Sequence, residues 1–219
     1  MNDAMVYGEK LTQLNPCDPR TLTLLLTPIL RLDAKLVDVG CGRGATLQWL
    51  SLHTRYRLYG TEPEKALRDV AALDCPEAVL SDAAAENLPY ADDYFDAAIM
   101  ECVFSLLADP AAAAAELARV ICLNGILLLS DVYSPAGVNV EAAENPLLRN
   151  IYSKETLEAF FENSGFAVLS VFDHTKDLRS MFAQMIMDGT AREFLDSPGR
   201  KALRRWKTGY GIWIFKKTG

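Results

Sequence analysis

Short apolar runs and helical patterns follow one another along the first part of the chain. The segments that read as strands lie at 36–37, 57–61, 78–80, 95–100 and 126–130, and the helical patterns between them lie at 45–50, 63–73 and 109–122. Asp109 is a suitable N-cap for the last of these helices, and Pro110 suits its first turn. Strands that alternate with helices predict a parallel sheet with helices on both faces.

The pattern changes after residue 131. Residues 132–150 contain Pro135, Gly137 and Pro146 and are predicted to be irregular. Beyond them the sequence predicts a helix at 153–164, a strand at 166–172, helices at 177–187 and 197–207, and a last strand at 210–216. A capping-box-like Ser153-x-x-Thr156 opens the first of these helices. The whole chain is therefore expected to contain seven strands.

A glycine-rich turn, Asp38-Val39-Gly40-Cys41-Gly42-Arg43-Gly44, joins the first strand to the first helix. Glycines permit positive φ, and amide groups at a helix N-terminus are expected to point outward, so a nucleotide-like ligand could lie against this backbone. The spacing is G-x-G-x-G rather than the G-x-G-x-x-G of dinucleotide sites. The carboxylate of Asp38 would repel a pyrophosphate but suits a ligand with an ammonium group. The alternative is a turn whose glycines serve geometry alone.

Three more acids, Glu62, Asp82 and Glu101, follow the second, third and fourth predicted strands. Because the carboxyl ends of parallel strands meet at one edge of a sheet, these acids are expected to gather there with Asp38. A carboxylate at position 62 can accept two hydrogen bonds from a ribose diol. The alternatives are a solvated acid at a helix start for Glu62 and a generic acidic loop around Asp82.

Two stretches resemble a known family. The string 38–44 resembles the first motif of the Rossmann-like S-adenosylmethionine-dependent methyltransferases, and the run 85–96 resembles that family's A-E-x-L-P-F-x-D-x-S-F-D element. The run 116–125 is similar to its structural E-x-x-R-V-L-K-P-G-G element, although it departs from it after Val120. The resemblance covers most of residues 36–131. It implies a three-layer α/β Rossmann-like sandwich with a mostly parallel sheet of seven strands in the order 3-2-1-4-5-7-6.

The resemblance also implies S-adenosylmethionine as cofactor and S-adenosylhomocysteine as product. The residues that it places at the cofactor are Asp38, Gly40, Cys41, Gly42, Gly44, Glu62, Pro63, Asp82, Ala83 and Glu101. In this family the acid at position 82 accepts from the adenine amine, and the amide of Ala83 donates to a ring nitrogen. Glu101 would serve through its side chain or its backbone carbonyl.

The methyl acceptor is expected to be a small molecule. Methyl transfer is an in-line displacement that owes much to proximity, so a general base is not obligatory. The segment 96–106 resembles the arsenite methyltransferase branch, where Cys102 corresponds to a metalloid-binding cysteine, but that branch's other cysteines are not matched. A small buried Cys102 beside the cofactor is the favoured alternative, and the quinone C-methylating branch is also similar. The catalytic residue stays open, with His174, Tyr7 and Cys102 as candidates.

The flanks of the chain are expected to form the acceptor pocket. The side chains expected above the strand ends are Tyr133, Tyr152, His174, Arg179, Phe182 and Met185. His174 is a candidate base or substrate clamp, and a helix-capping loop is its alternative reading.

Composition limits the remaining possibilities. The chain has 219 residues and is expected to be one domain, 1–219, with an N-terminal helical cap at 1–35, a cofactor-binding core at 36–131 and a substrate-side portion at 132–219. A net charge of −7 argues against a nucleic-acid partner, and the basic run 200–207 reads as a solvated helix face.

No segment reads as a membrane span or leader, and five cysteines without C-x-x-C favour a reducing cytoplasm. A metal site is not expected, and the chain is expected to be a monomer or a homodimer. The competing functions are an S-adenosylmethionine-binding scaffold that does not catalyse and an NAD(P)-dependent oxidoreductase.

Overall fold

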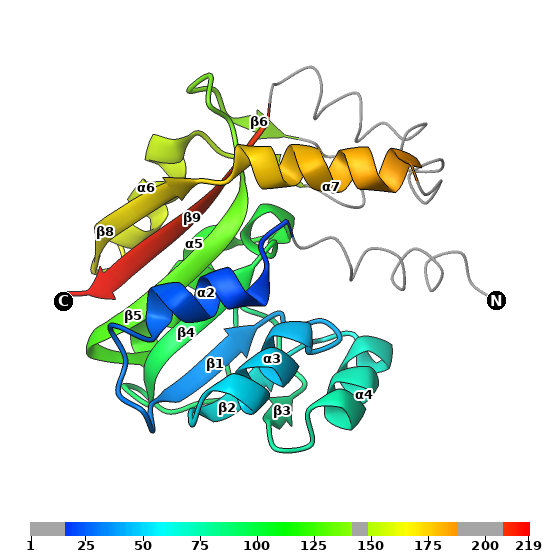
Figure 1. Cartoon of the computed structure of the whole chain (residues 1–219). Coiled ribbons are helices and arrows are strands. Elements are labelled where there is room, and N and C mark those ends of the chain that lie inside the picture. Colours follow the sequence, from blue (N-terminus) through cyan, green and yellow to red (C-terminus); the bar gives the residue numbers. More distant parts are fainter. Residues whose placement is uncertain (1–15, 142–148, 188–207) are drawn as a thin grey trace.

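The computed structural model describes residues 16–141, 149–187 and 208–219. A seven-stranded sheet in the order β3-β2-β1-β4-β5-β9-β8 forms its centre (Figure 1). The strands are β1 (Lys35–Val39), β2 (Arg57–Thr61), β3 (Val79–Ser81), β4 (Phe95–Glu101), β5 (Ile121–Tyr133), β8 (Phe166–Asp173) and β9 (Gly209–Lys217). The first five are parallel, and β9 runs antiparallel between β5 and β8. Numbered within this sheet alone, the order is 3-2-1-4-5-7-6, which confirms the expected topology.

Helices cover both faces of the sheet (Figure 1). They are α2 (Pro19–Leu26), α3 (Ala45–His53), α4 (Lys65–Asp74), α5 (Pro110–Val120), α6 (Lys154–Glu162) and α7 (Thr175–Met187), with a 3-10 turn η1 (Phe104–Leu106). Local chemistry sets several helix starts. The side chain of Asp109 accepts from the Ala112 amide at 3.0 Å, and that of Ser153 accepts from the Thr156 amide at 3.1 Å. Both are the N-caps that the sequence predicts.

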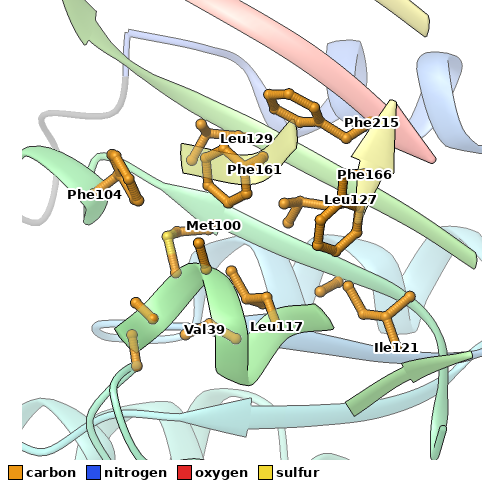
Figure 2. Close-up of a cluster of buried hydrophobic side chains, with 14 of the residues drawn as sticks. Val39, Met100, Phe104, Leu117, Ile121, Leu127, Leu129, Phe161, Phe166 and Phe215 are labelled. Carbon is orange, nitrogen blue, oxygen red and sulfur yellow. The ribbon is translucent and has the colours of Figure 1, made fainter. Parts of the chain in front are cut away.

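Two hydrophobic cores lie on opposite faces of the sheet. Alternate residues of the central strands divide between them, so that Ala98 and Met100 face one core while Ala97 and Ile99 face the other. The first core takes its helical residues from α5 and α6, and the second takes them from α2, α3, α4 and α7. Figure 2 shows phenylalanines of the first core gathered near the side chains of β5. The three-layer architecture follows from strands that are apolar on both faces.

The boundaries of several elements differ from the sequence predictions. The helix expected at 109–122 ends at Val120, and β5 begins directly at Ile121 rather than at 126. Asn124 takes a φ of +67°, and the β4–β5 register shifts so that Phe95 pairs with Ile121 but Ala97 pairs with Ile126. A bulge therefore lets the strand start early. The helix expected from residue 63 begins at Lys65.

The segment predicted to be irregular is partly ordered. Strand β5 continues to Tyr133, and β6 (Val140–Glu141) pairs antiparallel with β7 (Asn150–Ile151) in a separate two-stranded sheet. The helix predicted at 197–207 and residues 1–15 of the N-terminal cap lie outside the described residues.

Candidate functional site

A cavity of about 590 Å³ opens at the carboxyl ends of the parallel strands. The residues predicted at the cofactor that line it are Asp38, Gly40, Cys41, Gly42, Glu62, Pro63, Ala83 and Glu101. Strand β1 lies between β2 and β4, where the winding of the chain reverses direction, and open α/β sheets bind ligands at this point. The volume falls within the ordinary range for small-molecule sites.

The glycine turn has a left-handed backbone that glycine adopts without strain. Gly40, Gly42 and Gly44 have φ values of +76°, +54° and +80°. A Cβ at Gly40 would lie 2.5 Å from a methyl carbon of Val103, and one at Gly44 would lie 2.9 Å from the Cβ of Ala71. At Gly42 a Cβ would meet nothing within 4 Å. Two glycines are therefore needed for packing, whereas Gly42 leaves space open beside the cavity.

The amides of this turn point inward. Those of Gly40 and Cys41 donate to the carbonyl of Thr61 at 2.8 and 2.9 Å, and that of Gly44 donates to the carbonyl of Cys41 at 2.9 Å. The Gly42 amide donates to Oε2 of the Glu62 carboxylate at 3.0 Å. The prediction that the turn presents outward amides is therefore wrong for these four groups. Because those donors are engaged, they do not form a pyrophosphate cradle.

Asp38 is the most unusual group of the site. Its side chain is buried, and none of the described residues donates a hydrogen bond to its carboxylate. Burial and the nearby negative charges of Glu101 and Glu62 raise the pKa of Asp38 well above the usual range of an aspartate. A buried carboxylate without a donor is costly, and a cationic ligand group would remove that cost.

Two further carboxylates are held in place by the protein. Glu62 accepts from the amides of Glu64 and Gly42 at 2.8 and 3.0 Å, and burial raises its pKa in spite of those two bonds. Each of its oxygens keeps acceptor capacity for a ligand hydroxyl. Glu101 accepts from the hydroxyl of Thr46 at 2.5 Å, which joins the end of β4 to α3.

Asp82 and Ala83 are placed differently. Ala83 lines the cavity, whereas the Asp82 side chain is 70% exposed and pairs with the Arg68 guanidinium at 2.9 Å. Arg68 also donates to the carbonyl of Glu62. The direct contact of Asp82 with an adenine therefore stays a prediction, which this geometry does not favour.

Of the two catalytic candidates that the structure describes, one lines the cavity and the other does not. Cys102 lines the cavity with a left-handed φ of +54°, and burial together with the charge of Asp131 raises the pKa of its thiol well above the ordinary value. A neutral thiol is a poor nucleophile and a poor metal ligand. His174 lies outside the lining, with Nδ1 2.6 Å from the Asp177 carboxylate at the start of α7. The helix-capping reading of His174 fits this position better than a role as base.

Tyr7 and the side chain of Met185 lie outside the described residues. The other predicted acceptor residues, Tyr133, Tyr152, Arg179 and Phe182, are not part of the cavity lining. Within 16–141, 149–187 and 208–219, no three His, Cys, Asp or Glu side chains are grouped so that they could hold a metal ion.

Several residues that line the cavity were not predicted. They include Arg43, Thr46, Glu86, Leu106, Leu107, Ala108 and Arg149. Arg149 comes from the two-stranded β6–β7 region, and its amide donates to the carbonyl of Ser105 at 2.9 Å. No sequence signal connects these two residues, because the contact depends on how the chain returns over the strand ends.

Known proteins resemble the chain in both sequence and fold. Residues 37–129 match the family model described as "Methyltransferase domain". The chain matches none of the curated proteins. Among solved structures, the [4+2]-cyclase SpnF is 23% identical, with a TM-score of 0.75 over 91% of this chain and 81% of that one.

Two other structures are similar at lower identity. The YcgJ protein from Bacillus subtilis is 19% identical, with a TM-score of 0.66 over 92% of this chain and 100% of that one. A geranyl diphosphate C-methyltransferase from Streptomyces coelicolor A3(2) is 14% identical, with a TM-score of 0.71 over 91% of this chain and 79% of that one. At these identities the structures establish the fold. None of the helices in the described ranges has the length and apolar character needed to cross a membrane.

Proposed function

We propose, from the premise that this chain is a class I S-adenosylmethionine-dependent methyltransferase with its methyltransferase domain at 37–129, that it methylates a small-molecule acceptor by in-line displacement. One observation carries the proposal. Asp38 is a buried carboxylate without a donor among the described residues, and it faces a cavity at the switch point of the sheet beside Glu62 and Glu101. This arrangement favours a ligand that brings positive charge.

The residues present fit this cofactor. When bound, S-adenosylmethionine supplies an electrophilic methyl group on a sulfonium. Asp38 would hold the ammonium group, and Glu62 would accept from the ribose hydroxyls. The open space at Gly42 would let the ligand approach the backbone. A nicotinamide dinucleotide fits less well, because the turn amides donate internally and its pyrophosphate would meet three carboxylates.

The protein contributes mainly position and exclusion of water. Val103, Leu106 and Leu107 line the cavity beyond the end of β4 and give it an apolar wall. The cavity would hold the acceptor in line with the bond between the sulfonium and its methyl group. Proximity and orientation of this kind can supply much of the rate enhancement of a methyl transfer. The described residues offer no assigned base, which suits a nucleophile that reacts without one.

A small-molecule acceptor is supported by size, charge and likeness. The cavity of about 590 Å³ must hold cofactor and acceptor together, and the net charge of −7 disfavours polyanions. The structurally similar enzyme from Streptomyces coelicolor was crystallised with geranyl diphosphate. The [4+2]-cyclase SpnF shares the fold, so a test must measure methyl transfer and not binding alone.

Calorimetry followed by a turnover assay tests the proposal. The wild-type protein should bind S-adenosylmethionine and S-adenosylhomocysteine but neither NAD nor NADP, and should convert the first into the second with a pool of small metabolites. Glu62→Gln should weaken binding by roughly tenfold or more, since its amide NH₂ would face the Gly42 or Glu64 amide. The matched control is Asp69→Asn on α4, an exposed acid that pairs with Lys65 outside the cavity.

Two outcomes would contradict the proposal. Binding of a nicotinamide cofactor without S-adenosylmethionine would indicate an oxidoreductase. Tight binding of S-adenosylmethionine without turnover on any acceptor would indicate a scaffold that does not catalyse.

A further inference from the structure

The cavity lining contains both acidic and cationic side chains. Its acids are Asp38, Glu62, Glu86 and Glu101, and its cationic residues are Arg43 and Arg149. Arg43 belongs to the glycine turn and is therefore close in the chain to Asp38. Arg149 comes from just before β7 and is tied by its amide to the carbonyl of Ser105 in η1. The two arginines thus enter the cavity from different parts of the fold.

Arg149 shares the cavity with a group of apolar residues. The stretch after β4 contributes Val103, Leu106, Leu107 and Ala108 to the lining. In the part of the chain that the structure describes, no carboxylate forms an ion pair with the Arg149 guanidinium. An exposed guanidinium in a cavity that also has an apolar wall is a suitable receptor for an anion that is attached to an apolar body.

Arg43, the other arginine of the cavity, is a suitable partner for the carboxylate of the cofactor. Its amino-acid carboxylate would lie near its ammonium, which the proposed function assigns to Asp38 in the strand that leads into the turn. Arg43 lies in that turn and is the nearer partner in sequence. Arg149 is then left for the second ligand, next to the apolar residues that would contact it.

We propose that the methyl acceptor is an amphipathic anion, an apolar molecule that carries a carboxylate or a phosphate, and that Arg149 binds this anionic group while Val103, Leu106 and Leu107 contact the apolar part. This inference rests on the proposed function and adds a substrate class to it. Arg149 is a specificity-determining residue in this scheme, because a guanidinium can form two parallel hydrogen bonds with either anion.

The test uses four probes of equal chain length against the full-length protein saturated with S-adenosylhomocysteine. They are decanoate, decyl phosphate, decanol and decyltrimethylammonium, and their affinities are measured by calorimetry. At least one of the two anions should bind about tenfold or more tightly than decanol, and the ammonium probe should bind more weakly than decanol. The preference between decanoate and decyl phosphate distinguishes a carboxylate acceptor from a phosphate acceptor.

Two variants assign the effect to one residue. Arg149→Gln should weaken the binding of the preferred anion by about tenfold. The affinities for decanol and for S-adenosylhomocysteine should not change. Arg149→Lys should recover part of the loss because the charge is restored without the planar fork. Arg55→Gln is the matched control, since this arginine lies outside the cavity.

The contrary outcomes are separable. If neither anion binds better than decanol, or if Arg149→Gln leaves anion binding unchanged while the protein still binds S-adenosylhomocysteine, the substrate class is refuted and the proposed function stands. If Arg149→Gln weakens S-adenosylhomocysteine as much as the anion, Arg149 serves the cofactor and the inference is also refuted. If the wild-type protein does not bind S-adenosylhomocysteine, both proposals fall.

Discussion

Replacing Asp38 with Asn should stabilise the protein and at the same time weaken its binding of cofactor. Asn has nearly the shape of Asp but carries no charge. The residue is 3% exposed and lines the cavity, so the substitution changes the charge of the site with little change in packing. The two effects have opposite signs because the same carboxylate is a cost in the free protein and a partner for a bound cation.

The gain in stability follows from the pKa of Asp38. Burial, and then the charges of Glu101 and Glu62, raise that pKa, so the folded state binds the proton more tightly than the unfolded chain does. The contribution of Asp38 to stability is therefore complete below the unfolded pKa of about 3.9 and is lost as the pH rises through the raised folded value. At neutral pH the variant escapes this loss, although its amide also lacks donors. A net gain of about 1 kcal/mol would raise Tm by roughly 2–4 °C.

The loss of affinity follows from the missing ion pair. A hydrogen bond to a charged group contributes about 1.5–3 kcal/mol, so Asp38→Asn should weaken S-adenosylmethionine by roughly 10- to 150-fold. The wild-type affinity should also rise with pH through the raised pKa of Asp38, because only the ionised carboxylate attracts an ammonium group. In the variant this rise should be absent or reduced.

Differential scanning calorimetry measures the Tm, and titration calorimetry at several pH values measures the affinity. Asp69→Asn, which changes an exposed acid of α4, should alter neither quantity appreciably. A variant at position 38 that is less stable than wild type and binds the cofactor equally well would refute the reasoning on both counts.

Three further changes test other parts of the structure. Arg119→Lys should lower the free energy of unfolding by on the order of 2–3 kcal/mol in chemical denaturation, because Arg119 binds both oxygens of Glu116 and two carbonyls of the 88–92 segment. A decrease below about 0.5 kcal/mol would contradict this role. Burial raises the pKa of Asp131 to about 6, so the stability of wild type relative to Asp131→Asn should be greatest below about pH 4, the unfolded pKa, and should decline by on the order of 3 kcal/mol from there to pH 7. A pH-independent difference in urea denaturation would contradict this reasoning. Asp82→Asn should change S-adenosylhomocysteine affinity by less than about threefold in calorimetry, since its carboxylate is exposed, and a loss of about tenfold would instead support the adenine contact predicted from sequence.

Much of the fold and the position of the cavity could be predicted from the sequence. Alternating strands and helices imply a parallel sheet, and that sheet brings together the carboxyl ends of its strands. Asp38, Glu62 and Glu101 consequently reach one cavity although they are far apart in the chain. The strand order itself came from resemblance, because spacing alone does not distinguish alternative orders.

The directions of individual side chains could not be predicted in the same way. Asp82 follows its strand as expected, but its carboxylate pairs with Arg68 of α4 and is not part of the cavity lining. The turn amides were expected to face a ligand, yet the carbonyl of Thr61 and the carboxylate of Glu62 accept from them. Arg149 enters the cavity through a return of the chain that no local pattern encodes. In each case a tertiary partner decides between orientations that the local sequence allows equally.

The distribution of donors around the three carboxylates gives them different functions. Glu62 receives two amides and Glu101 receives the hydroxyl of Thr46, so the fold itself stabilises these charges in fixed positions. Asp38 receives no donor from the described residues and is repelled by both of them. A bound cation would offset the free energy that this repulsion costs the free protein, and ligand binding stabilises the folded state by an amount that rises with the logarithm of its affinity. We therefore expect the affinity for a cationic cofactor to depend strongly on Asp38, to which no described residue donates, and functional sites are commonly less stable than they could be for this reason.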